Sequence, residues 1–331
     1  MKPYISGVLR QLADGEFHSG MALARTLDVS RASVWNAVRE LEASGLAVYK
    51  VHGRGYRLPA PLTLLDPLLV ERGLGAAASR FALEVVEVAP STNALLLDRA
   101  AAGAASGSVI AAEWQSAGRG RRGRAWHTGI GGALAFSLLW RFAQGAGALS
   151  GLSLVVGVAL ARGLNAVVGL RAGLKWPNDI VSEGKKLGGI LIELSGDMLG
   201  PSTAVIGIGL NVRLSQKVRL AIDQPATDIE SLIEERVDRN ALLASLLLEL
   251  DRALSSFAAD GFAPFRSEWV KHHAHQGRTV TLLLPNGRSE RGRVRGVAED
   301  GALVLDTRGG PKYFRSGEVS LRTPSAARKL T

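Results

Sequence analysis

The chain has 331 residues, of which 47% are hydrophobic and 21% are charged, and its mean hydropathy is +0.13. This balance is typical of an ordered protein with two or three domains, and it excludes a disordered chain. The chain has no cysteine, which excludes a disulfide framework, a thiolate zinc site and a cysteine nucleophile. A net charge of +10 favours anionic partners, whether nucleic acid, nucleotides or acidic proteins.

The sequence predicts no signal peptide, because its first residues lack an apolar segment and a cleavage site. Together with the absence of cysteine, this favours a cytoplasmic protein. Residues 142–161 form an uncharged stretch of 20 residues, which is near the length that spans a bilayer. The stretch begins with small and polar residues and lacks aromatic anchors at both ends. We therefore expect a buried helix there and no partnership with a membrane.

The first 62 residues predict a winged helix-turn-helix domain. Apolar residues at helical spacing indicate a helix over residues 5–12, a second helix after Ser19 and through Leu27, and a third after Ser30. Met21 is counted among the apolar positions of the second helix. Residues 28–30 form the tight turn between the last two helices, and residues 46–58 predict two strands joined by a turn at 52–55. Prolines 59 and 61 indicate a linker.

Several polar residues of the third helix lie off its apolar stripe and are candidates for contacts with DNA bases or phosphates. A further arginine in the wing turn suits the minor groove or the backbone. The candidates are Arg31, Ser33, Asn36, Arg39 and Arg54. Winged helices also bind proteins, so a protein-binding role remains open at this point.

The rest of the chain predicts an α+β multidomain fold. From residue 64 to 272, apolar runs alternate with helical stretches, which is typical of a mixed α/β domain built on a β-sheet. Residues 239–257 predict a strong amphipathic helix, with Asp238 or Asn240 available as its cap. From residue 277, alternating apolar and polar residues with turns at 285–287 and 300–301 predict a small antiparallel, SH3-like β-barrel. We place the domain boundaries at 1–62, 63–273 and 274–331.

Residues 118–126, with the sequence GRGRRGRAW, carry the most informative pattern. Four arginines alternate with three glycines. Glycine lets the backbone approach a ligand closely, and arginine neutralises anionic oxygens. Such a loop should be mobile when empty and close over a phosphate-bearing ligand. It lacks the lysine of a Walker A loop and the spacing of a dinucleotide fingerprint, and a solvated basic loop or a nucleic-acid patch remains open on composition alone.

This loop closely resembles the signature loop of biotin–protein ligases, and its neighbours are similar in order and spacing. The further motifs are Ser91-Thr92-Asn93, Gln115, KWPNDI at 175–180, KKLGGILIE at 185–193 and GIGLN at 207–211. The similarity extends through the winged helix and the C-terminal strands. The chain is therefore identified as a member of the bifunctional biotin–protein ligase and biotin operon repressor family.

The resemblance implies a biotin–[acetyl-CoA-carboxylase] ligase, which activates biotin with ATP and Mg²⁺ to biotinyl-5′-AMP. The biotin is then transferred to a lysine of a biotin carboxyl-carrier protein. It also implies that the adenylate-bound form dimerises on operator DNA and represses genes of biotin synthesis and transport. Two alternatives remain open: a ligand-sensing transcriptional regulator without ligase activity, and a lipoate or octanoate protein ligase.

The resemblance also implies roles for particular residues. The residues implied to bind biotin are Ser91, Thr92, Asn93, Gln115, Arg119, Gly120, Arg121 and Lys186. Those implied near the nucleotide are Arg121, Trp126, Asn178, Gly209, Asn211 and Arg322. The implied catalytic residues are Lys186, Arg119 and Asp179, with Lys185 as an alternative if the register slips and with Asp179 orienting or deprotonating the acceptor lysine. Protein ligands for Mg²⁺ are not predicted.

Two features lie outside the implied pattern. Gln224-Pro225-Ala226-Thr227 has alanine where the family has an aromatic residue, which puts the contacts of that loop in doubt. His272, His273 and His275 are adjacent or two apart and have no neighbouring carboxylate, so we expect a hinge there, not a metal site.

Overall fold

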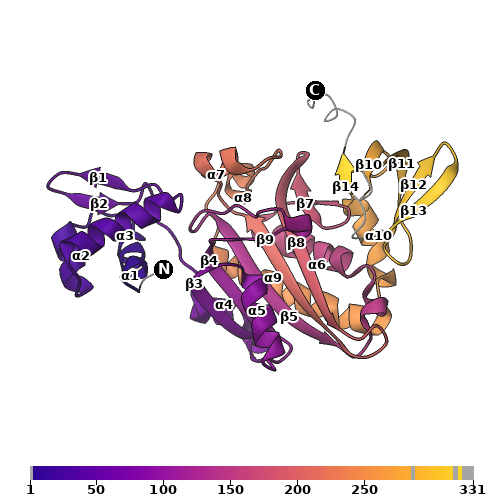
Figure 1. The fold of residues 1–331 in the computed structure, drawn as a ribbon, viewed down its shortest axis with the longest axis horizontal. Coiled ribbons are helices and arrows are strands. Elements are labelled where there is room, and N and C mark those ends of the chain that lie inside the picture. Colours follow the sequence, from indigo (N-terminus) through magenta and orange to yellow (C-terminus); the bar gives the residue numbers. More distant parts are fainter. Residues whose placement is uncertain (1–2, 285–287, 316–319, 323–331) are drawn as a thin grey trace.

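A computed structural model describes residues 3–284, 288–315 and 320–322, with an N-terminal helical domain beside a larger domain built on a sheet (Figure 1). The helical domain contains α1 (Pro3–Leu12), α2 (Gly20–Thr26) and α3 (Arg31–Ala43), followed by the antiparallel hairpin of β1 (Tyr49–Val51) and β2 (Gly55–Arg57). Ser19 and Ser30 cap α2 and α3, because their hydroxyls accept hydrogen bonds from the backbone N–H groups of Ala22 and Ser33. The helix-turn-helix and wing are confirmed, although Met21 is 56% exposed and does not join the core.

A seven-stranded mixed sheet forms the centre of the molecule. Its strands are β3 (Ala82–Ala89), β4 (Ser108–Gln115), β5 (Ala133–Phe142), β6 (Gly173–Lys175), β7 (Asp179–Ser182), β8 (Lys185–Gly196) and β9 (Ser202–Asn211). Their spatial order is β3-β4-β5-β9-β8-β7-β6. Only the β3–β4 pair of this sheet is parallel. The predicted mixed α/β domain is confirmed.

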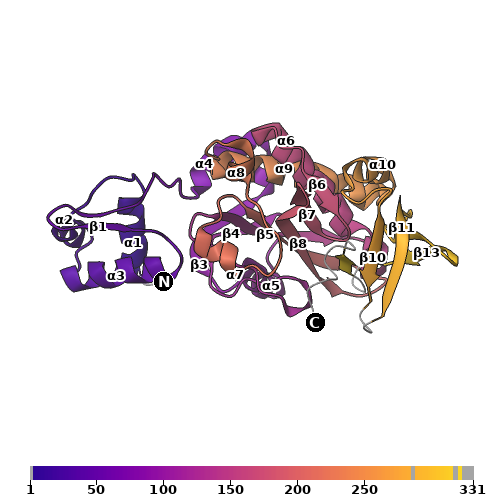
Figure 2. The same ribbon diagram turned by 90° about the horizontal axis from the view of Figure 1, so that it is seen from above.

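Helices cover both faces of this sheet, as the view from above shows (Figure 2). The helices α4 (Pro67–Leu74), α6 (Leu152–Val168) and α9 (Arg239–Asp260) pack on one face, and α5 (Thr92–Ala101) packs on the other. Asp238 caps α9 through the backbone N–H groups of its first turn. The remaining helices are α7 (Gln216–Ala221), α8 (Ile229–Ile233) and α10 (Ala263–His272), with 3₁₀ turns at Gly75–Arg80, Arg121–Gly123 and Ala146–Leu149.

The uncharged stretch 142–161 begins at the end of β5 and continues into α6, whose residues are mostly buried against α9 and the sheet. The expected buried helix is therefore present, although it starts ten residues into the stretch. Within the described residues, no helix combines the length and apolar character that crossing a bilayer requires.

The C-terminal strands form an antiparallel sheet that packs beside α10. They are β10 (Thr279–Leu283), β11 (Ser289–Val297), β12 (Leu303–Thr307), β13 (Gly310–Phe314) and β14 (Ser320–Arg322), in the order β13-β12-β11-β10-β14. Within the described residues β13 and β14 do not pair, so the sheet is not closed. The antiparallel strands agree with the prediction, and the closed SH3-like barrel is not confirmed.

The segment that joins the two main parts of the molecule is held by a buried ion pair. Arg239 Nη2 lies 2.7 Å from Glu113 Oε2, and both side chains are less than 5% exposed. Arg239 also donates to the carbonyl of Thr63, Glu113 accepts from the backbone N–H of Leu65, and Asn240 donates to the carbonyl of Leu64. These contacts fix the connecting segment to the sheet domain.

Candidate ligand-binding and active site

A cavity of about 1310 Å³ opens where the edges of β8, β7 and β6 meet the arginine-rich loop. Drug-sized ligands usually occupy ~300–1,000 Å³, so the cavity can hold two substrates together. All the predicted biotin-binding, catalytic and nucleotide residues line it except Arg322. The backbone of Arg322 ends β14 opposite Thr281, and its side chain lies outside the described residues.

One end of the cavity is formed by the start of α5. The Gln115 side-chain oxygen accepts a hydrogen bond from the backbone N–H of Thr92 at 2.8 Å. Its amide N–H₂ donates to none of the described residues and can donate to a ligand. Ser137 donates to Asn93 Oδ1 at 2.6 Å, and Asn93 in turn donates to Glu193 Oε2 at 2.8 Å. Ser91 occupies the N-cap position, but its side chain makes no capping hydrogen bond. The predicted polar cluster is thus assembled, and Ser91 is not a plain helix cap.

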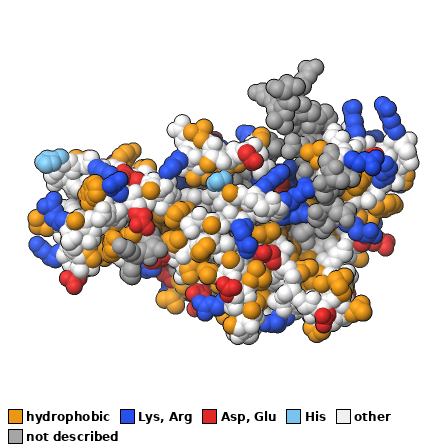
Figure 3. Space-filling view, in the orientation of Figure 1, with side chains coloured by type: hydrophobic (Ala, Val, Ile, Leu, Met, Phe, Trp, Pro, Cys, Tyr) orange, Lys and Arg blue, Asp and Glu red, His pale blue; other side chains and the backbone are white. Residues whose placement is uncertain are grey.

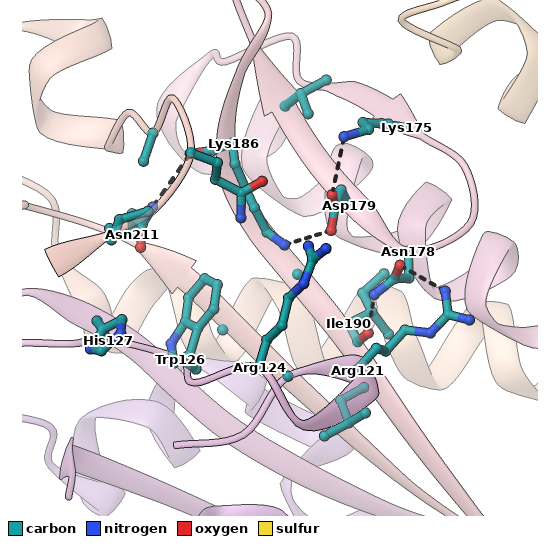
Figure 4. Close-up of a pocket in the computed structure, with 18 of the residues that line it drawn as sticks. Arg121, Arg124, Trp126, His127, Lys175, Asn178, Asp179, Lys186, Ile190 and Asn211 are labelled. Carbon is teal, nitrogen blue, oxygen red and sulfur yellow. Dashed lines mark hydrogen bonds and ion pairs between the residues drawn. The ribbon is translucent and has the colours of Figure 1, made fainter. Parts of the chain in front are cut away.

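The arginine-rich loop lines the same cavity. Arg121 donates to Asn178 Oδ1 at 3.0 Å, and Arg124 extends toward the pair formed by Lys186 and Asp179 (Figure 4). Burial lowers the pKa of the Arg121 guanidinium, and Asp179 opposes that shift. Arg122 adopts a left-handed conformation with φ of 60°, which costs a non-glycine residue energy. Such a loop can change conformation when an anion offers its arginines new partners.

Lys186 lies at the centre of the cavity and is held by a carboxylate. Its Nζ is 2.7 Å from Asp179 Oδ1, and Lys175 Nζ is 3.7 Å from Asp179 Oδ2 (Figure 4). A β-bulge on this strand pairs Val181 with Lys186 but Ile180 with Gly188, which re-aims the side chains between them. Lys185 is exposed and does not line the cavity. The structure therefore settles which of the two adjacent lysines faces the cavity.

The opposite wall is aromatic and packs closely on a glycine strand. A Cβ on Gly209 would lie 2.6 Å from the Trp126 ring, so only glycine leaves room for the indole. Lys186 Nζ lies 5.9 Å from the centre of the same ring. Trp126 Nε1 and Asn211 Oδ1 are buried and have no hydrogen-bond partner within the described part of the chain. Such atoms are costly to bury alone, and a polar ligand would satisfy them.

The cavity also contains residues that sequence reasoning did not assign. They include Lys175, His127, His275, Arg278 and the segment 221–226, together with Glu193 and Ser137 just behind the wall. Glu193 closes the KKLGGILIE motif, and it links Asn93 to Arg119, whose Nη2 lies 3.4 Å away. Its place in the motif was a usable signal. Ser137 carries no local pattern that distinguishes it, and the histidine cluster that contains His275 was interpreted as a hinge.

Ala226 lies at the cavity wall beside Lys186. The backbone N–H of Lys186 donates to the carbonyl of Pro225 at 2.9 Å, and Thr227 N–H donates to the carbonyl of Lys186 at the same distance. The small side chain of Ala226 leaves this position without the aromatic contact that the family pattern suggested. The loop is attached to the strand through its backbone.

A second candidate surface lies on the N-terminal domain. Arg31, Asn36 and Arg39 are exposed along α3, and Arg54 is exposed in the wing. Ser33 is half-buried, and its hydroxyl lies 2.9 Å from that of Ser30, so it takes part in capping the helix. Sequence reasoning missed Trp35, which is 47% exposed on the same helix with the Arg39 guanidinium 4.7 Å from its ring centre. In the view of Figure 3, Lys and Arg side chains are also concentrated over the C-terminal strands.

The three clustered histidines follow α10 at the junction with the C-terminal strands. His273 stacks on Trp269 at 4.5 Å between ring centres, and His272 Nδ1 lies 3.2 Å from the carbonyl oxygen of Ala172. Among the residues that the structure describes, no three His, Cys, Asp or Glu side chains are grouped to hold a metal ion.

The fold and the site define a class of protein: a helix-turn-helix domain fused to a mixed-sheet domain with a cation-lined cavity for anionic small molecules. Comparison with family models gives three matches. Residues 6–57 match an HTH domain, residues 85–211 match the Biotin/lipoate A/B protein ligase family, and residues 275–322 match the Biotin protein ligase C terminal domain.

Whole-length relatives agree with these matches. The chain is 38% identical over 312 residues to the Bifunctional ligase/repressor BirA of Escherichia coli, which covers 94% of this chain and 95% of that protein. It is 34% identical to the Biotin--[acetyl-CoA-carboxylase] ligase of Mycobacterium tuberculosis over 77% of this chain and 96% of the relative. The chain therefore belongs to the family of bifunctional biotin protein ligases with a repressor domain.

A solved structure extends the similarity to the fold. The biotin protein ligase from Aquifex aeolicus in complex with biotin and ATP is similar with a TM-score of 0.63 and 29% sequence identity. The match covers 73% of this chain and 98% of that one.

Proposed function

We propose that this protein is a biotin–[acetyl-CoA-carboxylase] ligase that also represses transcription. The observation that carries the proposal is the placement of Lys186. It lies in one cavity with the arginine-rich loop on one side and the polar start of α5 on another. A carboxylate and a nucleotide are both anions, and they can react only where cations offset their repulsion.

In the first step, a carboxylate oxygen of biotin attacks the α-phosphorus of ATP, and pyrophosphate leaves with the electrons of the broken P–O bond. Asn93 and Gln115 hold the ureido ring, while Lys186, Arg119 and Arg121 hold the carboxylate and the α-phosphate. Negative charge increases on the phosphate in the transition state, where a fixed cation stabilises it most. ATP enters with Mg²⁺, which protein sites usually bind through one or two carboxylates and the phosphates themselves.

In the second step, the ε-amine of the acceptor lysine attacks the carbonyl carbon of biotinyl-5′-AMP. An amide forms, AMP leaves, and the amine loses a proton. Asp179 is the carboxylate placed to take that proton or to orient the amine. Its two oxygens face Lys186 and Lys175. It becomes free when the substrate phosphates attract these lysines. The closed loop protects the mixed anhydride from water.

The adenylate also serves as the signal for repression. We propose that the adenylate-bound form dimerises and places two winged helices on operator DNA upstream of biotin genes. The exposed Arg31, Asn36, Arg39 and Arg54 support this role, because phosphate and base contacts need exposed polar side chains. Ser33 and Arg322 remain in the proposal as DNA-binding and nucleotide-binding residues.

The domain boundaries 1–62, 63–273 and 274–331 belong to the same proposal, with an SH3-like barrel at the C-terminus. Two packing contacts support the first boundary. Leu62 belongs to the hydrophobic cluster that contains the core of the N-terminal domain together with Ile130, and Leu65 belongs to the cluster of the sheet domain. ATP, the carrier protein and the genome are all reached from the cytoplasm, which is where we place the protein.

The test mixes the full chain with biotin, Mg·ATP and a biotin carboxyl-carrier domain and measures the mass of the acceptor. We expect a gain of one biotinyl group. Lys186→Met should slow adenylate formation by roughly 10²–10³-fold, as loss of a transition-state donor does. The matched control Lys185→Met should stay near wild type, because Lys185 is exposed outside the cavity.

An unchanged acceptor mass together with tight biotin binding would overturn the ligase proposal and leave a ligand-sensing regulator. The repressor proposal is tested separately by the anisotropy of labelled promoter DNA, with and without biotinyl-5′-AMP, and by sedimentation of the protein. The repressor proposal would be contradicted if biotinyl-5′-AMP raised neither the affinity for promoter DNA nor the sedimenting mass of the protein.

A further inference from the structure

One corner of the cavity lies beyond the residues assigned above, where the sheet edge meets the C-terminal strands. Lys175 ends β6, and His275 and Arg278 lie in the segment before β10, and all three line the cavity. The segment is attached to the sheet edge, since the backbone N–H of Ala274 donates to the carbonyl of Leu174 at 2.9 Å. The corner is therefore a built part of the cavity wall.

We infer that this corner binds the β- and γ-phosphates of ATP, and that His275 positions them by donating a hydrogen bond to a phosphate oxygen. His275 is thus a positioning residue for the leaving pyrophosphate. The inference rests on the proposed ligase function, and it assigns a role to a residue that none of the family motifs includes.

The state of the imidazole supports a donor role. Among the described residues, His275 Nδ1 is a buried atom without a hydrogen-bond partner. The other ring nitrogen, Nε2, is not in that situation. A neutral imidazole carries one proton, and an unpartnered buried N–H is costly. The proton is therefore assigned to Nε2, which does not belong to the buried atoms without a partner. Because His275 lines the cavity, this N–H is available to a ligand there.

The order of the strands supports phosphate as the ligand of this corner. α5 packs on β4, β5 and β9, and Asn93 at its start also donates to Glu193 toward the far end of β8, whereas Lys186 lies at the beginning of β8 and Lys175 lies on β6. Neighbouring strands are ~4.8 Å apart, so the sheet sets a direction from the ureido end, through Lys186, to the corner. A nucleotide whose α-phosphate lies at Lys186 can extend its other phosphates along that direction.

The charges around His275 favour the same ligand. Burial, together with the neighbouring Lys175 and Arg278, lowers the pKa of His275 to about 4. Burial also lowers the pKa of Lys175, against the effect of Asp179. The groups that face His275 are thus Lys175 with its partner Asp179, Arg278, and the neutral ring of His273 at 6.1 Å. The corner carries an excess of positive charge that an anion would relieve.

The experiment compares the full chain with His275→Phe, which keeps an aromatic ring without a donor, and His275→Gln, which keeps an amide donor. We measure the KM for ATP, the KM for biotin, kcat, and the affinity for inorganic pyrophosphate with Mg²⁺. In His275→Phe the KM for ATP should rise and the pyrophosphate affinity should fall, each roughly tenfold, as expected for one hydrogen bond to a charged group. The KM for biotin should not change, and His275→Gln should recover most of the loss.

The pH dependence provides a readout that a purely structural role would not change. A bound anion favours the imidazolium form of His275, so binding takes up a proton and the affinity rises as the pH falls. Because the pKa of His275 is about 4 without the anion, this gain appears on the acid side, and the ratio of pyrophosphate affinities between wild type and His275→Phe should widen as the pH falls from 7 toward 5. In the wild-type protein, the NMR-measured pKa of His275 should rise when pyrophosphate is added, which tests the inference even if a variant fails to fold.

Equal ATP KM and pyrophosphate affinity in wild type and His275→Phe would overturn the inference, and so would a His275 pKa that does not respond to pyrophosphate. An equal rise in the KM for biotin in His275→Phe would indicate that His275 has a structural role instead. If the wild-type chain forms no biotinyl-5′-AMP at all, it is the proposed function that fails. If the wild-type chain forms biotinyl-5′-AMP and the His275 variants form it with the same KM for ATP, only this inference fails.

Discussion

At the scale of single residues, the two buried histidines link folding to pH. His273 is 5% exposed against Trp269, and neither ring nitrogen makes a hydrogen bond of good geometry within the described residues, although the nearby Gln276 side chain opposes the effect of burial on its pKa. Burial lowers its pKa to about 4, and the pKa of His275 is lowered to the same value. An unfolded histidine has a pKa of ~6.5. Between these values the unfolded chain binds more protons than the folded one.

We therefore expect the free energy of unfolding to fall as the pH drops from 6.5 to 4. Each such histidine contributes a slope of up to ~1.4 kcal/mol per pH unit, with stability gained as the pH rises through this window. Urea unfolding at pH 5 and pH 7 measures the slope. His273→Phe keeps an aromatic ring on Trp269 and should reduce the pH slope of the free energy of unfolding by the contribution of about one proton. His52→Gln, in the exposed wing turn, should leave that slope as in wild type. A slope unaffected by His273→Phe would contradict this assignment.

The two adjacent lysines illustrate what a sequence can and cannot decide at this scale. Lys186 was predicted from its place in a motif, but a motif alone could not exclude a register slip to Lys185. The β-bulge between the Ile180–Gly188 and Val181–Lys186 pairs of β7 and β8 fixes which lysine faces the cavity, and a bulge depends on pairing with another strand. Met21 was misplaced for a related reason. Helical spacing identifies a stripe of residues, whereas the edge of that stripe depends on what packs against it.

At the scale of single elements, β9 separates the two ends of the cavity with two glycines. A Cβ at Gly209 would lie 2.6 Å from Trp126, and one at Gly207 would lie 2.2 Å from Asn93 Oδ1. Both distances are too short, so the facing side chain must move in either variant. Overpacking of this kind typically costs ~1–3 kcal/mol.

We predict that Gly207→Ala and Gly209→Ala separate binding of the two substrates. Gly207→Ala displaces Asn93 and should weaken biotin binding by roughly tenfold, a change of about 1.4 kcal/mol. Gly209→Ala displaces Trp126 and should raise the KM for ATP by a similar factor with a smaller effect on biotin. Calorimetric titration with biotin alone, followed by adenylation kinetics, measures both. If each variant weakened biotin binding and ATP binding equally, β9 would not separate a biotin end of the cavity from a nucleotide end.

Helix starts were predictable where the signal was local. Ser19, Ser30 and Asp238 each accept hydrogen bonds from N–H groups two or three residues ahead, so a short window of sequence contains the whole interaction. The closed C-terminal barrel was a different kind of prediction. Alternating residues define strands, but closure requires the first and last strands to meet, which no local pattern specifies.

At the scale of the whole molecule, a buried ion pair joins the parts of the chain. Glu113 and Arg239 are 126 positions apart, and no motif connects them. Sequence reasoning could not find the pair, because an arginine and a glutamate in amphipathic segments are usually exposed. The pair also holds the backbone of Thr63 and Leu65, so it positions the connecting segment.

We predict that Arg239→Met destabilises the protein by ~3–5 kcal/mol, because Glu113 is left buried without its partner. Limited proteolysis should also cut residues 58–66 faster. The control Arg252→Met lies on the same helix, where an exposed arginine pairs with Glu249, and it should cost less than ~1 kcal/mol. Denaturant unfolding compares the variants, and equal stabilities would show that the pair does not support the linker.

A second contact joins the cavity to the helix that carries the predicted DNA-binding residues. Lys217, in α7, donates to the carbonyl of Ala43 at 2.9 Å, at the C-terminal end of α3. The chain then runs from α7 directly into the cavity-lining segment 221–226. A lysine at this end of a helix satisfies a free carbonyl and opposes the helix dipole, which is worth ~0.3–1 kcal/mol. A ligand that fixes segment 221–226 should therefore also fix the end of α3.

This contact gives a prediction that needs no knowledge of the operator. Binding of biotinyl-5′-AMP should slow hydrogen exchange at the backbone amides of residues 44–46 by about two- to fivefold, the factor that corresponds to ~0.3–1 kcal/mol. Lys217→Met should abolish that change while leaving adenylate formation near wild type, because Lys217 does not line the cavity. Lys271→Met, an exposed lysine of α10, is the matched control and should retain the change. If the amides respond equally in Lys217→Met, the ligand reaches α3 by another route, such as the connecting segment held by Arg239.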